Sequence, residues 1–344
     1  MLGPACGGPQ PAAVTQSPTP SAIASTGQFF DPSPRELVTA FGPGIGGNMA
    51  CSSTALVFDD GPQHTLYTTG VATFQPRKLL TINGSIGPVR MSGSWVAFVV
   101  YTQAGQELSP LATWSVYGVE VTSGRSLVLA SGTNAIQLSE LPFPTVGDGF
   151  IVWDELMSVG NKVLWRYDTN SGATAQVGLP SGTYPVRPSA VGGMLMFLDN
   201  SRDPVRASET WLGRGGEPLL LDMGSGKITH LASGSVVTEP ALAPSRAVWI
   251  NGAAGTSAHD IQEVAIPSGT LRTLTQTKIV APLLANDQIT IWFAAPRGAV
   301  TALVGTRIAV VSPDLTVSPG GVALCGSDFY YGGPNLSLRV AHIG

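Results

Sequence analysis

The stretch FIVWDEL at residues 150–156 is one of seven short apolar runs that decide the fold. Each run contains an aromatic residue. The other six are TALVFDD (54–60), SWVAFVV (94–100), MLMFLDN (194–200), RAVWING (246–252), QITIWFA (288–294) and FYYGG (329–333). Their aromatic residues, from Phe58 to Tyr331, follow one another at intervals of 39 to 55 residues. Because four-stranded propeller blades repeat at about 40 to 50 residues, the runs predict an all-β propeller.

Turn residues divide each unit into strands. A tight turn precedes each run, as at Ser92-Gly93, and these residue types suit hairpin turns. Two more strand-like segments follow each of the first six runs, and four of these pairs are joined by a Ser-Gly turn that begins at residue 123, 171, 225 or 268. No segment shows convincing helical periodicity, so we expect little helix.

The two ends of the repeat region predict how the ring closes. After Tyr331 the chain has room for one further strand, at 336–343, so the last unit lacks its fourth strand. The segment ELVTAF (36–41) precedes the first complete unit, and pairing it onto the last blade would remove two exposed sheet edges. We therefore expect one domain over residues 35–344 with seven four-stranded blades, and six blades as the alternative count.

Residues 1–34 form a separate tract. The first 30 residues carry no charged side chain and are rich in Pro, Ala, Ser and Thr, a composition typical of a flexible tether. The segment LGPACGG (2–8) resembles the lipidation site of bacterial lipoproteins, which implies a lipid anchor at Cys6 and a secreted or cell-envelope protein. The alternative is a free Cys6 thiol in a disordered tail.

Composition excludes several classes of function. The chain has 344 residues, 12% of them charged, with 18 Lys and Arg and a net charge of −4, which argues against nucleic-acid binding. No uninterrupted apolar run reaches the length of about 18 residues that a membrane span needs. We expect a monomer that contacts a membrane only through a lipid at Cys6. Its partner would be a protein, a peptide or an envelope glycan.

The hairpin pattern and the Ser-Gly turn before the strand LRTLT (271–275) resemble the TolB-like family of six- and seven-bladed propellers, and more broadly WD40-like repeats. The resemblance covers residues 36–344 and concerns the fold. The family's Ser-Pro-Asp-Gly turn survives only in fragments such as Gly147-Asp148-Gly149. The resemblance therefore implies a propeller and no particular activity.

Cys51 and Cys325 occupy equivalent positions in the first and seventh units, which are neighbours in a closed ring. A disulfide between them would lock the closure. If Cys6 is lipidated, the remaining cysteines are even in number, as expected in an oxidising compartment. The alternative is two buried free thiols that behave as small apolar side chains.

Motif searches show no catalytic signature. The sequence contains neither H-E-x-x-H nor G-x-S-x-G, and its four histidines lack metal-ligand spacing, so we name no catalytic residue and no metal ligand.

Acidic residues follow the aromatic strands on one rim: Asp59, Asp60, Asp154, Glu155 and Asp199. Converging carboxylates can bind Ca²⁺ or serve a glycosidase or lyase. The alternative is that they accept hydrogen bonds from the backbone of their own turns.

Two insertions, at 101–113 and 201–217, lengthen the same rim. The second contains Arg202, Arg206, Trp211 and Arg214, and arginines beside a tryptophan suit recognition of a carboxylate or a peptide. The alternative is a solvated loop.

The leading interpretation of the whole sequence is an extracytoplasmic, non-catalytic binding or scaffold propeller. The alternative is a carbohydrate-active enzyme, a glycosidase or lyase, that uses the rim carboxylates.

Overall fold

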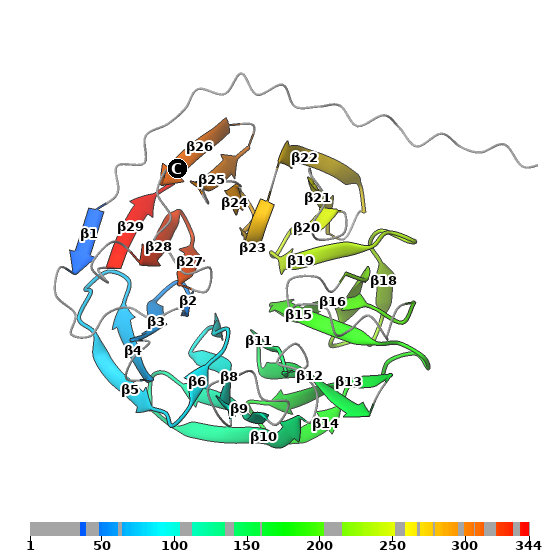
Figure 1. The fold of residues 1–344 in the computed structure, drawn as a ribbon, viewed down its shortest axis with the longest axis horizontal. Helices are drawn as coiled ribbons and strands as arrows, with labels where there is room; N and C mark the ends of the chain where they lie inside the picture. The colour runs from blue at the N-terminus through cyan, green and yellow to red at the C-terminus, as the bar shows by residue number, and fades with distance from the viewer. Residues whose placement is uncertain are drawn as a thin grey trace, which may run out of the picture.

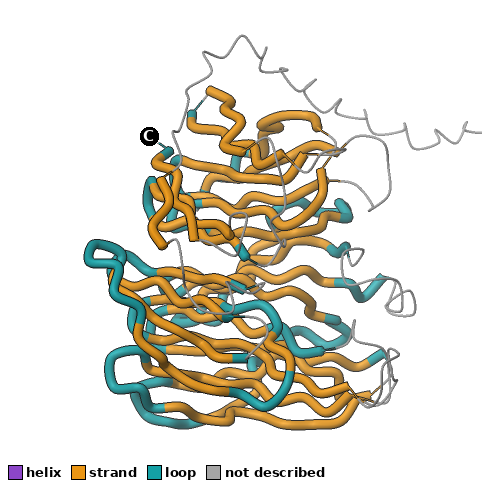
Figure 2. Tube along the Cα trace, turned by 60° about the vertical axis from the view of Figure 1, so that its left-hand side comes forward, coloured by secondary structure: helices purple, strands orange, loops and turns teal. Residues whose placement is uncertain are grey.

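The computed structural model describes residues 35–38, 48–60, 64–103, 112–134, 141–158, 160–202, 215–251, 259–266, 269–277, 279–294, 299–305, 307–312, 321–332 and 338–343. The regular secondary structure of these residues consists of strands only, and the strands form seven antiparallel sheets around one axis (Figure 1). In a view turned by 60°, the strands of successive sheets lie over one another (Figure 2). The predicted all-β propeller of seven blades is confirmed. A search of the described residues finds no helix able to span a membrane.

The strands of each blade follow one another outward from the axis. Blade 1 contains β2 (Met49–Cys51), β3 (Ala55–Asp59), β4 (Thr65–Gly70) and β5 (Arg77–Thr81). Blade 2 contains β6 (Ser85–Ile86), β7 (Arg90–Ser92), β8 (Trp95–Gln103), β9 (Ala112–Glu120) and β10 (Ser126–Asn134). Blade 3 contains β11 (Pro144–Gly147), β12 (Phe150–Ser158), β13 (Asn161–Asp168) and β14 (Thr174–Gln176). Blade 4 contains β15 (Pro185–Val191), β16 (Met194–Asp199), β17 (Glu217–Asp222) and β18 (Ile228–His230).

The remaining blades have the same order. Blade 5 contains β19 (Val237–Leu242), β20 (Arg246–Asn251), β21 (His259–Ala265) and β22 (Leu271–Thr277). Blade 6 contains β23 (Ile279–Ala285), β24 (Ile289–Ala294), β25 (Ala299–Val304) and β26 (Arg307–Ser312). Blade 7 contains β27 (Val322–Cys325), β28 (Asp328–Gly332), β29 (Leu338–His342) and β1 (Arg35–Val38).

Blade 2 differs from the expected four strands in two ways. Its innermost strand is interrupted at Pro88, so that β6 and β7 pair separately with β8. Strands β8 and β9 also extend into the expected insertion at 101–113, where Tyr101 pairs with Trp114. The long hairpin forms because β-branched and aromatic residues continue past the predicted strand ends.

The ring closes as the sequence predicted. Strand β1 pairs antiparallel with β29, with Arg35 opposite Val340, and completes blade 7 (Figure 1). β1 covers residues 35–38 rather than the predicted 36–41, and residues 1–34, including Cys6, lie outside the described residues. The first and last strands of the repeat region therefore share one sheet, which removes two free strand edges.

A disulfide joins Cys51 of β2 to Cys325 of β27. The two Cα atoms are 5.9 Å apart, within the usual range for disulfides, because the innermost strands of blades 1 and 7 lie next to each other. Both cysteines lie at the end of an innermost strand, just before the turn into the second strand. We call this side of the ring the turn rim and the opposite side, where second and third strands connect, the loop rim.

Large aromatic side chains fill the interfaces between blades. Trp153 of blade 3 is fully buried and packs with Val99 and Trp114 of blade 2. Trp249 of blade 5 is fully buried against Met196 of blade 4. The aromatic residues that set the sequence repeat thus hold adjacent blades together, and each contributes a large buried apolar area.

The predicted Ser-Gly turns lie on the turn rim. Their glycines, Gly124, Gly172, Gly226 and Gly269, have φ angles between +67° and +75°, which other residues rarely adopt. An aspartate at the start of two of these turns accepts backbone N–H groups: Ser171 donates to Asp168 at 2.9 Å and Gly224 to Asp222 at 2.9 Å. Backbone hydrogen bonds lower the pKa of both aspartates.

The disulfide predicts a large loss of stability on reduction. It closes a loop with a sequence separation of 274 residues, so the chain-entropy model gives a loss of about 5 to 6 kcal/mol without it. Denaturant unfolding of the Cys51→Ser, Cys325→Ser double variant should show a lower free energy of unfolding than wild type, and reductant should lower only that of wild type. An unchanged unfolding midpoint, or two free thiols in the folded protein by mass spectrometry, would contradict the closure described here.

Candidate functional site

Three of the predicted rim aspartates hold the beginnings of innermost strands. Asp59, Asp154 and Asp199 lie in the second strands of blades 1, 3 and 4. Each carboxylate accepts a backbone N–H from the start of the first strand in its own blade. The donors are Asn48, Phe143 and Tyr184, at 3.3, 2.5 and 2.9 Å. The repeated arrangement satisfies backbone donors that have no ladder partner.

The other two predicted carboxylates are in different environments. Asp60 is fully buried, and its Oδ1 accepts the N–H of Thr65 at 2.9 Å, while its Oδ2 has no hydrogen-bond partner among the residues described. Glu155 is half-buried and accepts Nε1–H of Trp153 at 3.3 Å. Desolvation raises the pKa of Glu155, because burial disfavours its charged form.

Across the described part of the chain, no three His, Cys, Asp or Glu side chains are grouped so that they can hold a metal ion. The expected Ca²⁺ ligands on the loop rim are therefore not brought together there. Asp59 instead accepts Nδ2–H of Asn48 at 3.0 Å, and Asp199 accepts the hydroxyl of Ser201 at 3.0 Å.

The predicted cationic loop is described only at its first residue. The Arg202 side chain is 69% exposed and its Nη2 lies 3.5 Å from Oε2 of Glu217. The other oxygen of Glu217, Oε1, lies 2.6 Å from Nδ1 of His230. Arg206, Trp211 and Arg214 lie outside the described residues, so their role as a binding cluster stays a prediction.

A feature that the sequence analysis missed lies on the innermost strands. Blades 2 to 6 each carry a proline there: Pro88, Pro144, Pro188, Pro240 and Pro282. Proline is tolerated because the inner side of these strands has no ladder partner. In blades 4 and 5 the preceding residues, Arg187 and Glu239, have φ angles of +52° and +49°, and a β-bulge surrounds each proline. Such backbone strain is concentrated at functional sites in proteins.

The two bulges redirect backbone N–H groups toward the neighbouring blade. Ala190 of blade 4 donates to Oγ1 of Thr145 in blade 3 at 3.0 Å. Leu242 of blade 5 donates to Oγ of Ser189 in blade 4 at 3.2 Å. The hydroxyl follows the proline directly in both acceptor strands, so the same bond recurs at two successive blade boundaries and fixes their spacing.

Four charged side chains form linked contacts from the second and third strands of blade 3 to the innermost strands of blades 4 and 5, and we call them the inner-edge cluster: Asp154, Lys162, Arg187 and Glu239. Lys162 Nζ lies 2.9 Å from Oδ2 of Asp154, and both side chains are only 2% exposed. The same carboxylate accepts the backbone N–H of Arg187 at 3.2 Å, and the Arg187 guanidinium pairs with Glu239. Two cations and two anions make the cluster neutral, and its carboxylates are occupied.

Arg90 lies beside this cluster, and the described residues leave most of its donors unfilled. Its guanidinium is over the ring of Phe143, 5.0 Å from the ring centre, and Nη1 donates to the carbonyl of Val89 at 3.0 Å. No carboxylate of the described residues forms an ion pair with it. Burial lowers the pKa of Arg90 to about 10, so the group is still charged at neutral pH. A guanidinium has five N–H donors, so Arg90 can bind a planar anion by donating hydrogen bonds to it.

Comparisons with known proteins define the fold. No protein-family model matches the chain, and no curated protein matches it by sequence. An acylaminoacyl peptidase from Pyrococcus horikoshii has a TM-score of 0.56 at 8% identity, covering 77% of this chain. An oligogalacturonate lyase in complex with manganese has a TM-score of 0.56 at 11% identity, covering 93% of this chain and 96% of the lyase. A protein from Agrobacterium tumefaciens described as TolB aligns over 69% of this chain and 82% of its own length, at 12% identity and a TM-score of 0.46.

These likenesses concern the fold alone, because every identity is far below 25%. The aligned region spans 44% of the length of the acylaminoacyl peptidase. The chain is a seven-bladed β-propeller, as the TolB-like resemblance implied. Within that fold, the inner-edge cluster and Arg90 are the candidate functional site.

The inner-edge cluster predicts that Asp154→Asn lowers the free energy of unfolding strongly, which denaturant titration measures. This change removes the charge that Asp154 places 2.9 Å from the buried Lys162 ammonium, and breaking a buried ion pair costs about 3 to 5 kcal/mol. Asp199→Asn, which breaks no buried ion pair, should cost about 1 to 2 kcal/mol in the same denaturant titration. Adding Lys162→Met to Asp154→Asn should recover part of the loss. Equal costs for the two aspartates would show that the ion pair contributes nothing.

Proposed function

We propose that this chain is a non-catalytic binding propeller that recognises a carboxylate-bearing segment of a protein partner, with Arg90 as the group that binds the carboxylate. One observation carries the proposal: a half-buried, charged guanidinium, most of whose donors no described residue fills, lies beside an ion-pair cluster in a chain with few charges. No carboxylate among the described residues offsets its desolvation, which favours binding of an anion there. An anionic envelope polymer offers the same chemistry.

Two carboxylates of the loop rim, Asp59 and Asp154, favour binding over acid–base chemistry. A glycosidase needs two carboxyl groups that face a substrate across roughly 5 to 9.5 Å. Here Asp154 is occupied by Lys162 and by two backbone N–H groups, and Asp59 by Asn48. Carboxylates bound in this way are not available to protonate or deprotonate a substrate.

An extracytoplasmic location is part of the proposal. The disulfide between Cys51 and Cys325 supports it, because disulfides persist in oxidising compartments. A lipid at Cys6, with the uncharged tract as its tether, would hold the propeller at a membrane surface. In this proposal the protein acts as a monomer on a cell envelope or after secretion.

The second candidate is a carbohydrate-active enzyme. One observation favours it, the alignment with oligogalacturonate lyase over nearly the full length of both chains. The test is incubation of the purified protein with oligogalacturonate, with and without Mn²⁺, followed by detection of unsaturated products. Turnover that Asp154→Asn abolishes would replace the binding proposal, and no turnover would exclude this activity.

Arg90 gives the binding proposal a direct test. Fluorescence anisotropy with a labelled hexaglutamate peptide should show binding to wild type. Arg90→Gln should weaken it about tenfold or more, because a charge-assisted bidentate contact is lost. Arg90→Lys keeps the charge but loses the fork, so its affinity should be intermediate.

The matched control is Arg125→Gln. Arg125 also lies in blade 2 and over an aromatic ring, that of Trp95, but is 52% exposed and pairs with Glu120. Its replacement should leave peptide binding unchanged. Equal affinities of wild type and Arg90→Gln, with both proteins folded by circular dichroism, would refute the assignment.

A further inference from the structure

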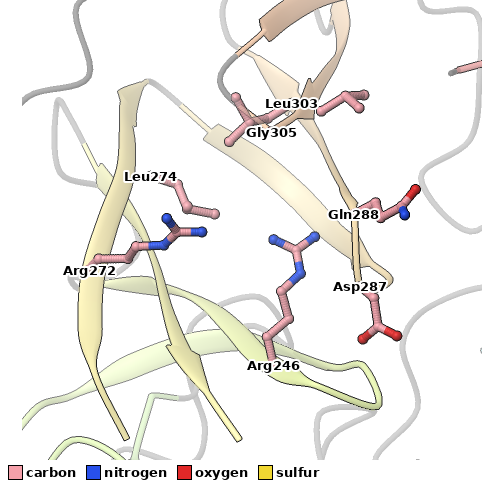
Figure 3. A pocket seen from close by; sticks show the side chains of 8 residues that line it. Arg246, Arg272, Leu274, Asp287, Gln288, Leu303 and Gly305 are labelled. Carbon is pink, nitrogen blue, oxygen red and sulfur yellow. The ribbon is translucent and has the colours of Figure 1, made fainter. Parts of the chain in front are cut away.

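A pocket of about 540 Å³ opens between blades 5 and 6 on the turn rim. Arg246 of β20 and Arg272 and Leu274 of β22 form one wall. The other wall comes from turns of blade 6, with Asp287 and Gln288, and from β25 with Leu303 (Figure 3). The volume is within the usual range for small-molecule sites.

Arg246 is a fixed structural part of the pocket. Its Nε and Nη2 donate to the carbonyls of Asn286 and Ile289 at 2.6 and 2.7 Å, which ties blade 5 to blade 6. Its Nη1 donates to Oε2 of Glu263 at 2.7 Å. Glu263 is 4% exposed, so its charge is largely removed from solvent. The carboxylate therefore holds Arg246 in place and takes no part in binding a cation from solution.

Arg272 pairs with the other oxygen of Glu263 through Nε, so its two terminal nitrogens, Nη1 and Nη2, remain available for a ligand. Its Nε pairs with Oε1 of Glu263, while the side chain is 64% exposed. No protein acceptor for its Nη1 and Nη2 is found among the described residues. Figure 3 shows both guanidiniums directed into the pocket, with the Asp287 carboxylate turned away from them. Asp287 accepts the N–H and hydroxyl of Ser245 at 2.8 and 2.7 Å.

The depth of the same interface is apolar but contains two polar atoms without partners. Leu274 and Leu303 belong to a buried cluster that also includes Trp292. Thr290 lies opposite Leu303 in the sheet and is fully buried. Oγ1 of Thr290 and Nε1 of Trp292 have no hydrogen-bond partner among the described residues. Buried polar atoms without partners are rare in folded proteins, and a bound molecule or water can satisfy them.

We propose that this pocket binds a small monocarboxylate with an apolar body. The carboxylate takes the bidentate position on Nη1 and Nη2 of Arg272, because that fork matches its planar geometry. The apolar body lies against Leu274, Leu303 and Val304. Arg246 and Arg272 share the one negative charge of Glu263, so these three groups have a net charge of +1, which favours a single anionic group.

Isothermal titration calorimetry with 4-phenylbutyrate tests the proposal, with its neutral amide and inorganic phosphate as comparison probes. Wild type should bind the acid more tightly than either comparison probe. Arg272→Gln should weaken binding of the acid about tenfold or more, and Arg272→Lys should weaken it less. Because this side chain is largely exposed, both variants should keep the wild-type fold and unfolding temperature.

Arg125→Gln is the control and should bind 4-phenylbutyrate as wild type does, whereas Arg90→Gln reports any binding of the acid at the inner edge. A loss of binding in Arg90→Gln alone would place the ligand at the inner edge and overturn the pocket assignment. Equal affinity of wild type and Arg272→Gln would overturn it too, as would tighter binding of phosphate than of the acid. No binding across a panel of short aliphatic and aromatic monocarboxylates would also refute the proposal.

Discussion

The innermost strands of the seven blades are the constraint on which the rest of the structure depends. They meet around one axis and have a ladder partner on only one side, so their remaining backbone groups need other partners. Side chains supply these partners: Asp59, Asp154 and Asp199 hold the beginnings of the strands, and hydroxyls hold the bulges. Because the same solution recurs from blade to blade, much of the small number of charges in this chain has a structural role.

Closing the ring requires partners for the first and last strands of the repeat region as well. Blade 7 is completed by β1, and the disulfide lies at the boundary between blades 7 and 1. Turns on this rim are also joined by Ser245 to Asp287 and by Asn286 to Gly326. These links make the turn rim a rigid frame, and the pocket between blades 5 and 6 lies within it. Long loops on the opposite rim can vary without disturbing that frame.

The sequence predicted the blade count, the Ser-Gly turns, the closing strand and the cysteine pair, because each depends on local turn chemistry or on a repeat. It did not assign the partners of Asp154, since Lys162 and Arg187 contact this carboxylate from another strand and another blade. The recurring prolines of the innermost strands were a visible signal that was overlooked. The pocket could not be found this way, because Arg272 and Leu303 meet only when two blades pack.

The central claim is that the inner edge near Arg90, rather than the carboxylates of the loop rim, binds the partner. Hydrogen exchange measured by mass spectrometry, with and without hexaglutamate peptide, tests it most directly. Binding should slow exchange of backbone amides in residues 86–92 and 141–147, where Arg90 and Phe143 lie, because a bound segment stabilises this region against local opening. Unchanged exchange in these segments, with slower exchange only around Asp59 or Asp199, would contradict the account.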